Sequence, residues 1–195
     1  HSVYPEVTSS PLGNQKLVSP SIIDITIDPS TGFVTALDTQ NKLHTKTSLK
    51  TGNWQALSPG GPWLSVSYGS DGNYYFVGTD KVTNVGGSSP SDAPGQATNK
   101  SPVLNMALMP DGSYIAVNTD NYLVHCSASA ISWTTIDDNI KIQALTVRPD
   151  GSLAAAGTNN KLYIRAGIET NQSWREVTEI TTPIIKEPKK RKENP

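Results

Sequence analysis

The sequence contains almost none of the residues that build disulfide or metal sites. Cys126 is the only cysteine among 195 residues, so no disulfide can form within the chain. The three histidines, His1, His44 and His125, occur singly, without HxH, HxxxH or HExxH spacing. We therefore expect no metal site and no cofactor. The one arrangement that would chelate copper needs His1 as the mature N-terminus together with a second histidine.

Charge and long apolar runs are also scarce. Only 17% of the residues are charged and the formal net charge is −1, so no basic field favours nucleic acid as a partner. No apolar run approaches the ~20 residues that span a bilayer, and we expect no membrane insertion. The exception to the low charge is Lys189–Lys192, in a basic C-terminal tail over residues 183–195. This tail is interpreted as a solvated segment, with a nuclear-targeting or polyanion-binding patch as the alternative.

Catalytic motifs are missing as well. The sequence has no Gly-x-Ser-x-Gly, P-loop or GxGxxG pattern. No pair of catalytic carboxylates can be selected, because Asp120 belongs to a turn and Asp137 and Asp138 to a loop. Cys126 is interpreted as a buried strand residue rather than a nucleophile. We therefore expect that the protein is not an enzyme.

What the sequence does contain is a repeat. Turn glycines recur at a nearly constant interval, at Gly32, Gly72, Gly112 and Gly151, and a threonine follows each glycine at the same distance. Each unit has an apolar alternating run, a turn ending in glycine, a second apolar run, a second turn and a third run. A period of about 40 residues with four short strands is typical of a β-propeller blade. The repeated threonines and turn aspartates are interpreted as bonding to turn backbone.

The repeat predicts an all-β chain, a β-propeller of about four blades, each blade a four-stranded antiparallel meander. The propeller should cover residues 1–182, with units at about 22–57, 63–100, 103–137 and 142–178. Glycine in the turns supplies the positive φ of tight hairpins. The second unit differs from the others, because residues 86–102 are loop by composition and lack the tryptophan that ends the other units.

The best-kept unit has a family resemblance. Its segment LYIRAGIETNQSWREV resembles the repeat of tectonin-type β-propellers, with an aromatic or aliphatic residue before Arg, a Gly-Ile step, a polar loop and a Trp. The matching positions are Leu162, Tyr163, Arg165, Gly167, Ile168 and Trp174. This family includes secreted lectins with repeated weak sugar sites, generally of five or six blades, and propeller modules of intracellular proteins. The resemblance therefore implies either glycan binding or protein interaction.

The candidate site residues follow from the repeat and the resemblance. Three tryptophans, Trp54, Trp133 and Trp174, recur near the end of their units. They either pack between neighbouring blades or expose a face on which a sugar could stack. The predicted carbohydrate-binding set is Trp54, Trp133, Trp174, Arg165, Asn53 and Asn171.

Two functional hypotheses result. The first is a lectin-like propeller that binds glycans of cell surfaces or glycoproteins and is extracellular. The alternative is a protein-protein interaction propeller in the cytoplasm or nucleus, which the basic tail favours. Tyr4–Val7 resembles the outer strand at residues 174–177, so the chain has one outer strand in excess. That surplus would pack at the edge of the ring or pair with a second copy, which would give a homo-oligomer.

Overall fold

The computed structural model describes residues 20–57, 61–92, 95–98, 100 and 102–178. It contains sixteen described strands in four antiparallel sheets of four strands, and strand order within every sheet follows the chain. Each sheet is one blade, so the four-bladed propeller of meanders is confirmed. Tyr4–Val7 and the basic tail lie outside the described residues.

The strands of each blade are short. Blade 1 holds β1 Ile22–Ile27, β2 Val34–Asp38, β3 Leu43–Lys46 and β4 Gln55–Ala56; blade 2 holds β5 Trp63–Tyr68, β6 Tyr74–Gly78, β7 Thr83–Val85 and β8 Gln96–Ala97. Blade 3 holds β9 Asn105–Leu108, β10 Tyr114–Val117, β11 Leu123–Cys126 and β12 Thr134–Asp137. Blade 4 holds β13 Ile142–Val147, β14 Leu153–Gly157, β15 Leu162–Arg165 and β16 Arg175–Glu176.

The two turns in each blade have the expected conformations. The repeated glycines have φ between 75° and 83°, which is the left-handed region that glycine enters without strain. The second turn of each blade also needs a positive φ, and it is taken by Asn41, Lys81, Asn121 and Asn160, with φ between 62° and 71°. Asparagine tolerates this region better than most residues, and this explains its recurrence at three of the four positions.

Blade 2 departs from the prediction of a plain loop over residues 86–102. This stretch contains a 3-10 turn, Pro90–Asp92, and the outer strand β8, which pairs with β7. Gly95, with φ of 65°, directs the chain back to β7 at a point where a Cβ atom would overlap the Val85 backbone. Composition indicated a loop because β8 is very short and because the second unit lacks the tryptophan found near the end of the other three units.

Large apolar clusters join each blade to the next. We call the side of a blade that packs on the following blade its forward face, and the opposite side its backward face. Between blades 1 and 2, Leu37 and Leu43 pack against Val66, Tyr74 and Phe76. The cluster between blades 2 and 3 includes Tyr75, Val77, Met106, Leu108 and Ala116, and that between blades 3 and 4 includes Ile115, Val117, Leu145, Leu153 and Trp174.

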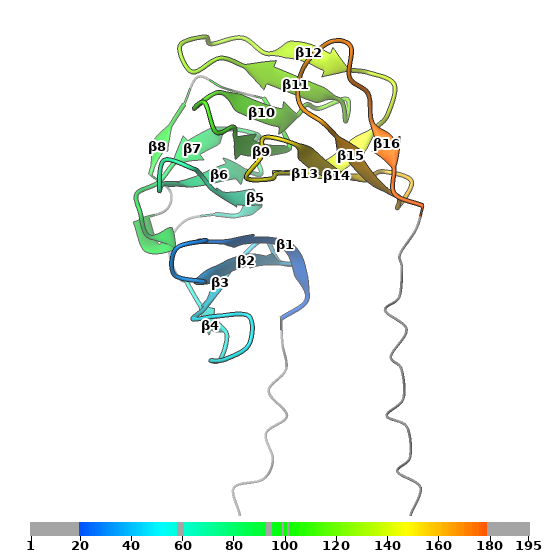
Figure 1. Cartoon of the computed structure of the whole chain (residues 1–195). Helices are drawn as coiled ribbons and strands as arrows, with labels where there is room; N and C mark the ends of the chain where they lie inside the picture. Colours follow the sequence, from blue (N-terminus) through cyan, green and yellow to red (C-terminus); the bar gives the residue numbers. More distant parts are fainter. Residues whose placement is uncertain (1–19, 58–60, 93–94, 99, 101, 179–195) are drawn as a thin grey trace, which may run out of the picture.

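The blades are arranged as an arc around their innermost strands (Figure 1). Strand β1 packs on β5, β5 on β9, and β9 on β13. Among the described residues β13 has no comparable contact with β1. The first and fourth blades therefore stand at two open ends of the arc.

Candidate functional site

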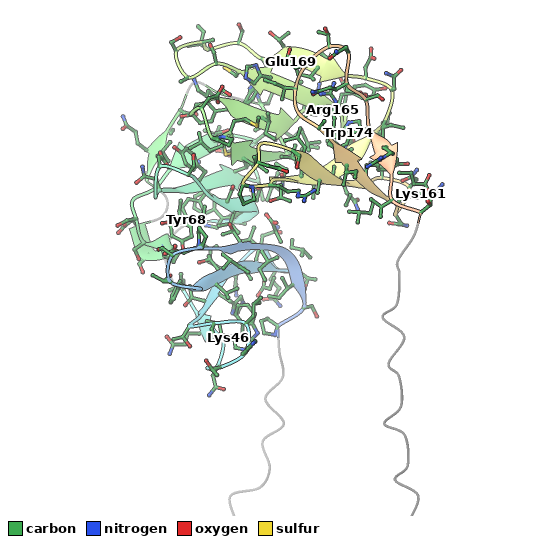
Figure 2. All side chains as sticks on the ribbon, viewed as in Figure 1. Lys46, Tyr68, Lys161, Arg165, Glu169 and Trp174 are labelled. Atoms are coloured by element: carbon green, nitrogen blue, oxygen red, sulfur yellow. The ribbon has the colours of Figure 1, made fainter. Side chains whose placement is uncertain are left out.

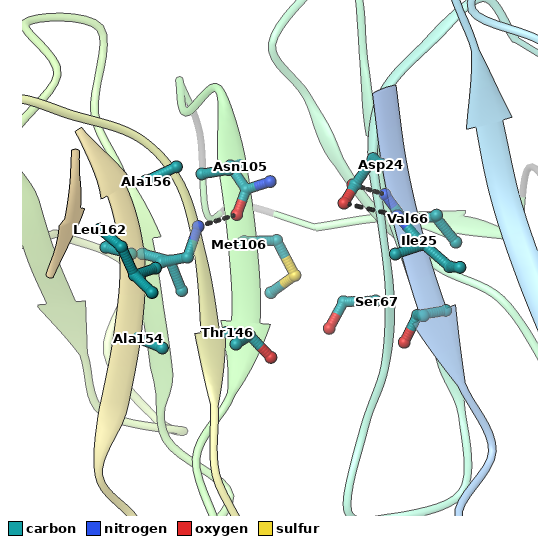
Figure 3. Close-up of a pocket in the computed structure, with 14 residues that line it drawn as sticks. Asp24, Ile25, Val66, Ser67, Asn105, Met106, Thr146, Ala154, Ala156 and Leu162 are labelled. Carbon is teal, nitrogen blue, oxygen red and sulfur yellow. Dashed lines mark hydrogen bonds between the residues drawn. The ribbon is translucent and has the colours of Figure 1, made fainter. Parts of the chain in front are cut away.

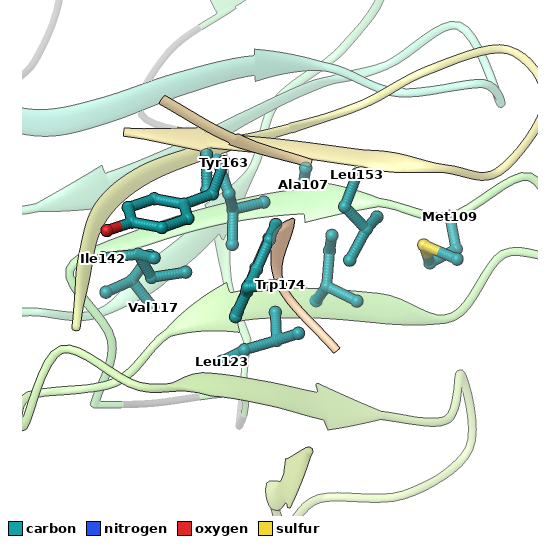
Figure 4. Close-up of a cluster of buried hydrophobic side chains, with 11 residues drawn as sticks. Ala107, Met109, Val117, Leu123, Ile142, Leu153, Tyr163 and Trp174 are labelled. Atoms are coloured by element: carbon teal, nitrogen blue, oxygen red, sulfur yellow. The ribbon is translucent and has the colours of Figure 1, made fainter. Parts of the chain in front are cut away.

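The structure places the most conspicuous predicted site residue, Trp174, in a core. Its side chain is buried in the cluster between blades 3 and 4, beside Leu123 and Leu153 (Figure 4). Its indole N–H is buried without a hydrogen-bond partner among the described residues. The ring can stack on a sugar only if this core opens, so the packing interpretation fits Trp174.

Arg165 holds the loop that leads to Trp174, and both are labelled in Figure 2. It is only 2% exposed, and its guanidinium donates to the carbonyls of Gly167, Glu169 and Gln172. Asp137 lies beside it, with 3.9 Å between Nε and a carboxylate oxygen. Burial lowers the pKa of Arg165, and the Asp137 charge opposes that shift. Nε is buried without a hydrogen-bond partner among the described residues, whereas the two terminal nitrogens donate to three loop carbonyls. Arg165 therefore acts in this geometry as a brace for the loop.

The other predicted residues lie on the outer part of the arc, in separate blades. Trp133 is half-buried against the cluster between blades 2 and 3. Trp54 in blade 1 is half-buried, with the Lys46 ammonium 5.9 Å from the centre of its ring. Asn53, beside Trp54, and Asn171 in blade 4 are both exposed on loops. The structure does not bring these residues together into one site, and Trp54 with Asn53 is the pair that leaves polar and aromatic groups accessible.

Arg165 occupies a repeat position at which the residue type differs between blades, although the side chain has the same role in three of them. It stands at the same distance after the turn glycine as Lys46, Gly86 and Cys126 in the other blades. Lys46 donates to the Leu49 carbonyl. The single hydrogen of the Cys126 thiol is shared between the Ala130 carbonyl, at 3.2 Å, and the Ser127 carbonyl, at 3.5 Å. The side chain at this position therefore ties down the loop before the outer strand in blades 1, 3 and 4.

A lysine from the neighbouring blade supports the same loop in blade 3. The Lys100 ammonium donates to the carbonyls of Ala128 and Ala130. It also lies 4.8 Å from the centre of the Tyr114 ring, which adds a cation–π contact. Blade 3 therefore holds its outer loop with the Cys126 thiol and with a cation from blade 2.

Sequence reasoning missed the hollow on the inner side of the arc (Figure 3). It has a volume of about 260 Å³ and is bordered by the inner strands of all four blades. Its lining residues are Asp24, Ile25, Thr26, Val66, Ser67, Asn105, Met106, Ala144, Leu145, Thr146, Ala154, Ala155, Ala156 and Leu162. This set contains no aromatic residue and no cation. The signal for it lay in the inner strands, where small polar residues alternate with apolar ones.

Polar side chains of the inner strands cross between blades and also border the hollow. Asn105 on β9 accepts the Leu145 N–H through Oδ1 at 3.3 Å, and Figure 3 shows its amide nitrogen directed toward the hollow. The hydroxyl of Ser67 and the side chain of Met106 point into the same space. Thr26 accepts the Tyr68 N–H at 2.9 Å. The hollow thus offers uncharged donors and acceptors beside apolar carbon.

Asp24 is the one charged residue of the lining. Its carboxylate accepts the N–H groups of Val66 and Ile25, both at 2.9 Å. Burial between β1 and β5 raises the pKa of Asp24 to about 6, and the hydrogen bonds from Val66, Ile25 and Ser65 oppose that shift only in part. Asp24 therefore acts chiefly as an acceptor that joins blades 1 and 2.

The described residues contain no group of three or more His, Cys, Asp or Glu side chains able to hold a metal ion. His44 pairs with Asp38 at 2.7 Å in blade 1, whereas Cys126 is buried in blade 3, so these groups do not form one constellation. Over the ranges that the structure describes, no helix is long and apolar enough to span a membrane.

Comparisons with known proteins give similarity of fold only. No protein-family model matches the chain. No curated protein matches it either. Among solved structures, one similar chain is described as YCF48 bound to D1 peptide, with 16% sequence identity and a TM-score of 0.48. The match covers 85% of this chain and 55% of the other, so the present chain spans about half the length of that protein. These comparisons assign no family to the chain, and the propeller fold rests on its four four-stranded sheets.

Proposed function

We propose that this chain is a non-enzymatic binding protein whose inner hollow holds a short, extended, uncharged segment of another polypeptide. The observation that carries the proposal is the chemistry of the lining, with amide and hydroxyl groups at Asn105 and Ser67 beside the apolar side chain of Met106. An extended peptide presents N–H and C=O groups that match such side chains, while its small apolar side chains match the rest of the wall.

The same lining argues against other ligand classes at this place. A sugar site usually offers an aromatic platform, and the hollow has none. A phosphate or nucleic acid needs cations or free helix N-termini, and the lining residues include no lysine or arginine. Its volume of about 260 Å³ is close to the lower limit of about 300 Å³ for ligand pockets, which restricts the occupant to a short segment.

The experiment is selection of a random peptide library against the full chain, followed by affinity measurement on the enriched sequence. Ser67→Tyr should fill the hollow and weaken binding at least about tenfold, a loss of about 1.4 kcal/mol. The matched control is Thr134→Tyr on the exposed outer strand β12, which should leave affinity unchanged. Failure to enrich any peptide, or equal loss in both variants, would contradict the proposal.

A second candidate function is glycan binding in blade 1, with an extracellular location as the tectonin resemblance implies. It is favoured by Trp54 and the exposed Asn53 on a loop of serine and threonine residues. This proposal involves a single site, because Trp174 and Arg165 are buried and Trp133 packs against the cluster between blades 2 and 3. A glycan array with the wild type and Trp54→Ala tests it: binding that Trp54→Ala retains, or no binding at all, argues against a lectin.

A further inference from the structure

The two open ends of the arc expose positions that are buried in the middle of it. On the backward face, Ile25 of blade 1 is 47% exposed, whereas the residues at the same register position in blades 2, 3 and 4 are at most 9% exposed. Those residues are Val66, Met106 and Leu145. Ile23 and Ile27, on alternate positions of β1, are 51% and 39% exposed. Val34 and Ala36 on β2 are buried, so on the backward face of blade 1 the large exposed apolar side chains are those of β1.

The forward face shows the same contrast at blade 4. Leu162 is 51% exposed, whereas the corresponding residues of blades 1, 2 and 3, Leu43, Thr83 and Leu123, are at most 2% exposed. Ala154 and Ala156 on β14 are half-buried. Their counterparts in blade 3, Ile115 and Val117, are fully buried against blade 4. Each end therefore carries one half of an interface that the chain forms three times internally.

The two halves are complementary in size and in polar groups. Three isoleucines on β1 face outward at one end, and two alanines at the other end leave room for larger side chains. Within the arc, the Thr26 hydroxyl of a forward face accepts the Tyr68 N–H of the next inner strand. Thr146 of blade 4 is the exposed counterpart of Thr26, and Ile27 of blade 1 stands at the register position of Tyr68.

We propose that the forward face of blade 4 in one copy of this chain packs on the backward face of blade 1 in a second copy. The partner is a second copy because one chain carries both halves and repeats the same contact three times between its own blades. Such a contact is heterologous, so it generates a closed ring or an extending array according to the angle between copies. Ser67 and Asn105, on the middle strands of the arc, stay outside the contact. Ile25, Thr146, Ala154, Ala156 and Leu162 border the hollow as well, so association of copies and occupation of the hollow compete for these side chains.

The test is the mass of the full chain in solution, measured by sedimentation over a range of concentrations. Wild type should associate reversibly. Ile27→Glu on blade 1 and Leu162→Glu on blade 4 should each weaken association at least about tenfold, because either places an unpaired carboxylate inside the contact. Leu49→Glu and Ile131→Glu are matched controls, since both residues are exposed loop positions, at 59% and 68%, and should not change association.

Mixing the two end variants distinguishes this geometry from others. The Ile27→Glu copy keeps an intact blade 4 face and the Leu162→Glu copy an intact blade 1 face, so an equimolar mixture should form a one-to-one complex. A contact between identical faces would not be restored by mixing. A wild type that stays monomeric at its highest soluble concentration, loop controls that weaken association equally, or a mixture that stays monomeric would each overturn the proposal. Circular dichroism of every variant establishes that it is folded.

Discussion

Replacing Asp24 with asparagine should stabilise the protein at neutral pH and remove part of its pH dependence. The carboxylate is held between β1 and β5, where burial raises its pKa from 3.8 to about 6. Blade 3 provides the precedent, because Asn105 occupies the same register position and its amide oxygen accepts the Leu145 N–H. The amide oxygen that the substitution introduces could accept the Val66 N–H in the same way.

The sign of the effect follows from proton binding. The folded state holds a proton on Asp24 up to about pH 6, whereas the unfolded chain releases it near pH 3.8. The contribution of Asp24 to stability is therefore greatest at low pH, falls as pH rises between these values, and is constant above about pH 6. At 1.36 kcal/mol per pKa unit, roughly 3 kcal/mol of unfolding free energy is lost across this window.

The variant should recover part of that loss. Asparagine removes the cost of burying a charge but also loses the bond from the Ile25 N–H, worth about 1 kcal/mol. We expect Asp24→Asn to be more stable than wild type by about 1–2 kcal/mol at pH 7 and no more stable at pH 4. Urea denaturation followed by tryptophan fluorescence at pH 4, 5, 6 and 7 measures the difference.

The control is Asp138→Asn, an exposed loop aspartate, which should leave a pH-independent difference from wild type. Using the difference between variant and wild type cancels the titration of other carboxylates. If Asp24→Asn and wild type show parallel pH profiles, the carboxylate does not titrate as described. If the variant is less stable at pH 7, the hydrogen bonds of the carboxylate outweigh the cost of its burial.

Two further predictions concern the residues around the outer loops. Arg165→Met should lower the unfolding free energy by about 2–4 kcal/mol, because it leaves the carbonyls of Gly167, Glu169 and Gln172 without their donor, and Arg165→Lys should fall between it and wild type in chemical denaturation. An Arg165→Met variant as stable as wild type would show that water satisfies these carbonyls. Trp174→Ala should cost about 3–5 kcal/mol and Trp54→Ala less than about 1 kcal/mol, since only Trp174 belongs to a buried cluster. Equal thermal-shift changes in the two variants would contradict this difference.

The fold was predictable because its information is local and repeated. The turn glycines at a nearly constant spacing, with alternating apolar positions between them, predict the meander and the number of blades. Strand β8 was missed because so short a strand shows no alternation of apolar and polar residues. Its position depends instead on Gly95 and on pairing with β7.

The site was less predictable, because burial at a blade interface is a property of the neighbours. Trp54 and Trp174 occupy matching places in the repeat, yet of these two only Trp174 is enclosed, because it packs on apolar residues of the preceding blade. Arg165 resembles a binding residue in sequence, since nothing local shows that three backbone carbonyls converge on its guanidinium. The inner hollow depends on the innermost strands of all four blades, which lie far apart in the chain, together with β14 and β15 of blade 4.

The loop tie at the position of Arg165 has a consequence for how this protein could diversify. A lysine, a thiol and a guanidinium each satisfy loop carbonyls from the same backbone position, and blade 2 uses a glycine there. The strands before this position keep one geometry, while the loop after it takes whatever length and shape its own tie supports. One rim of the arc can therefore acquire new recognition loops blade by blade, without disturbing the apolar clusters that hold neighbouring blades together.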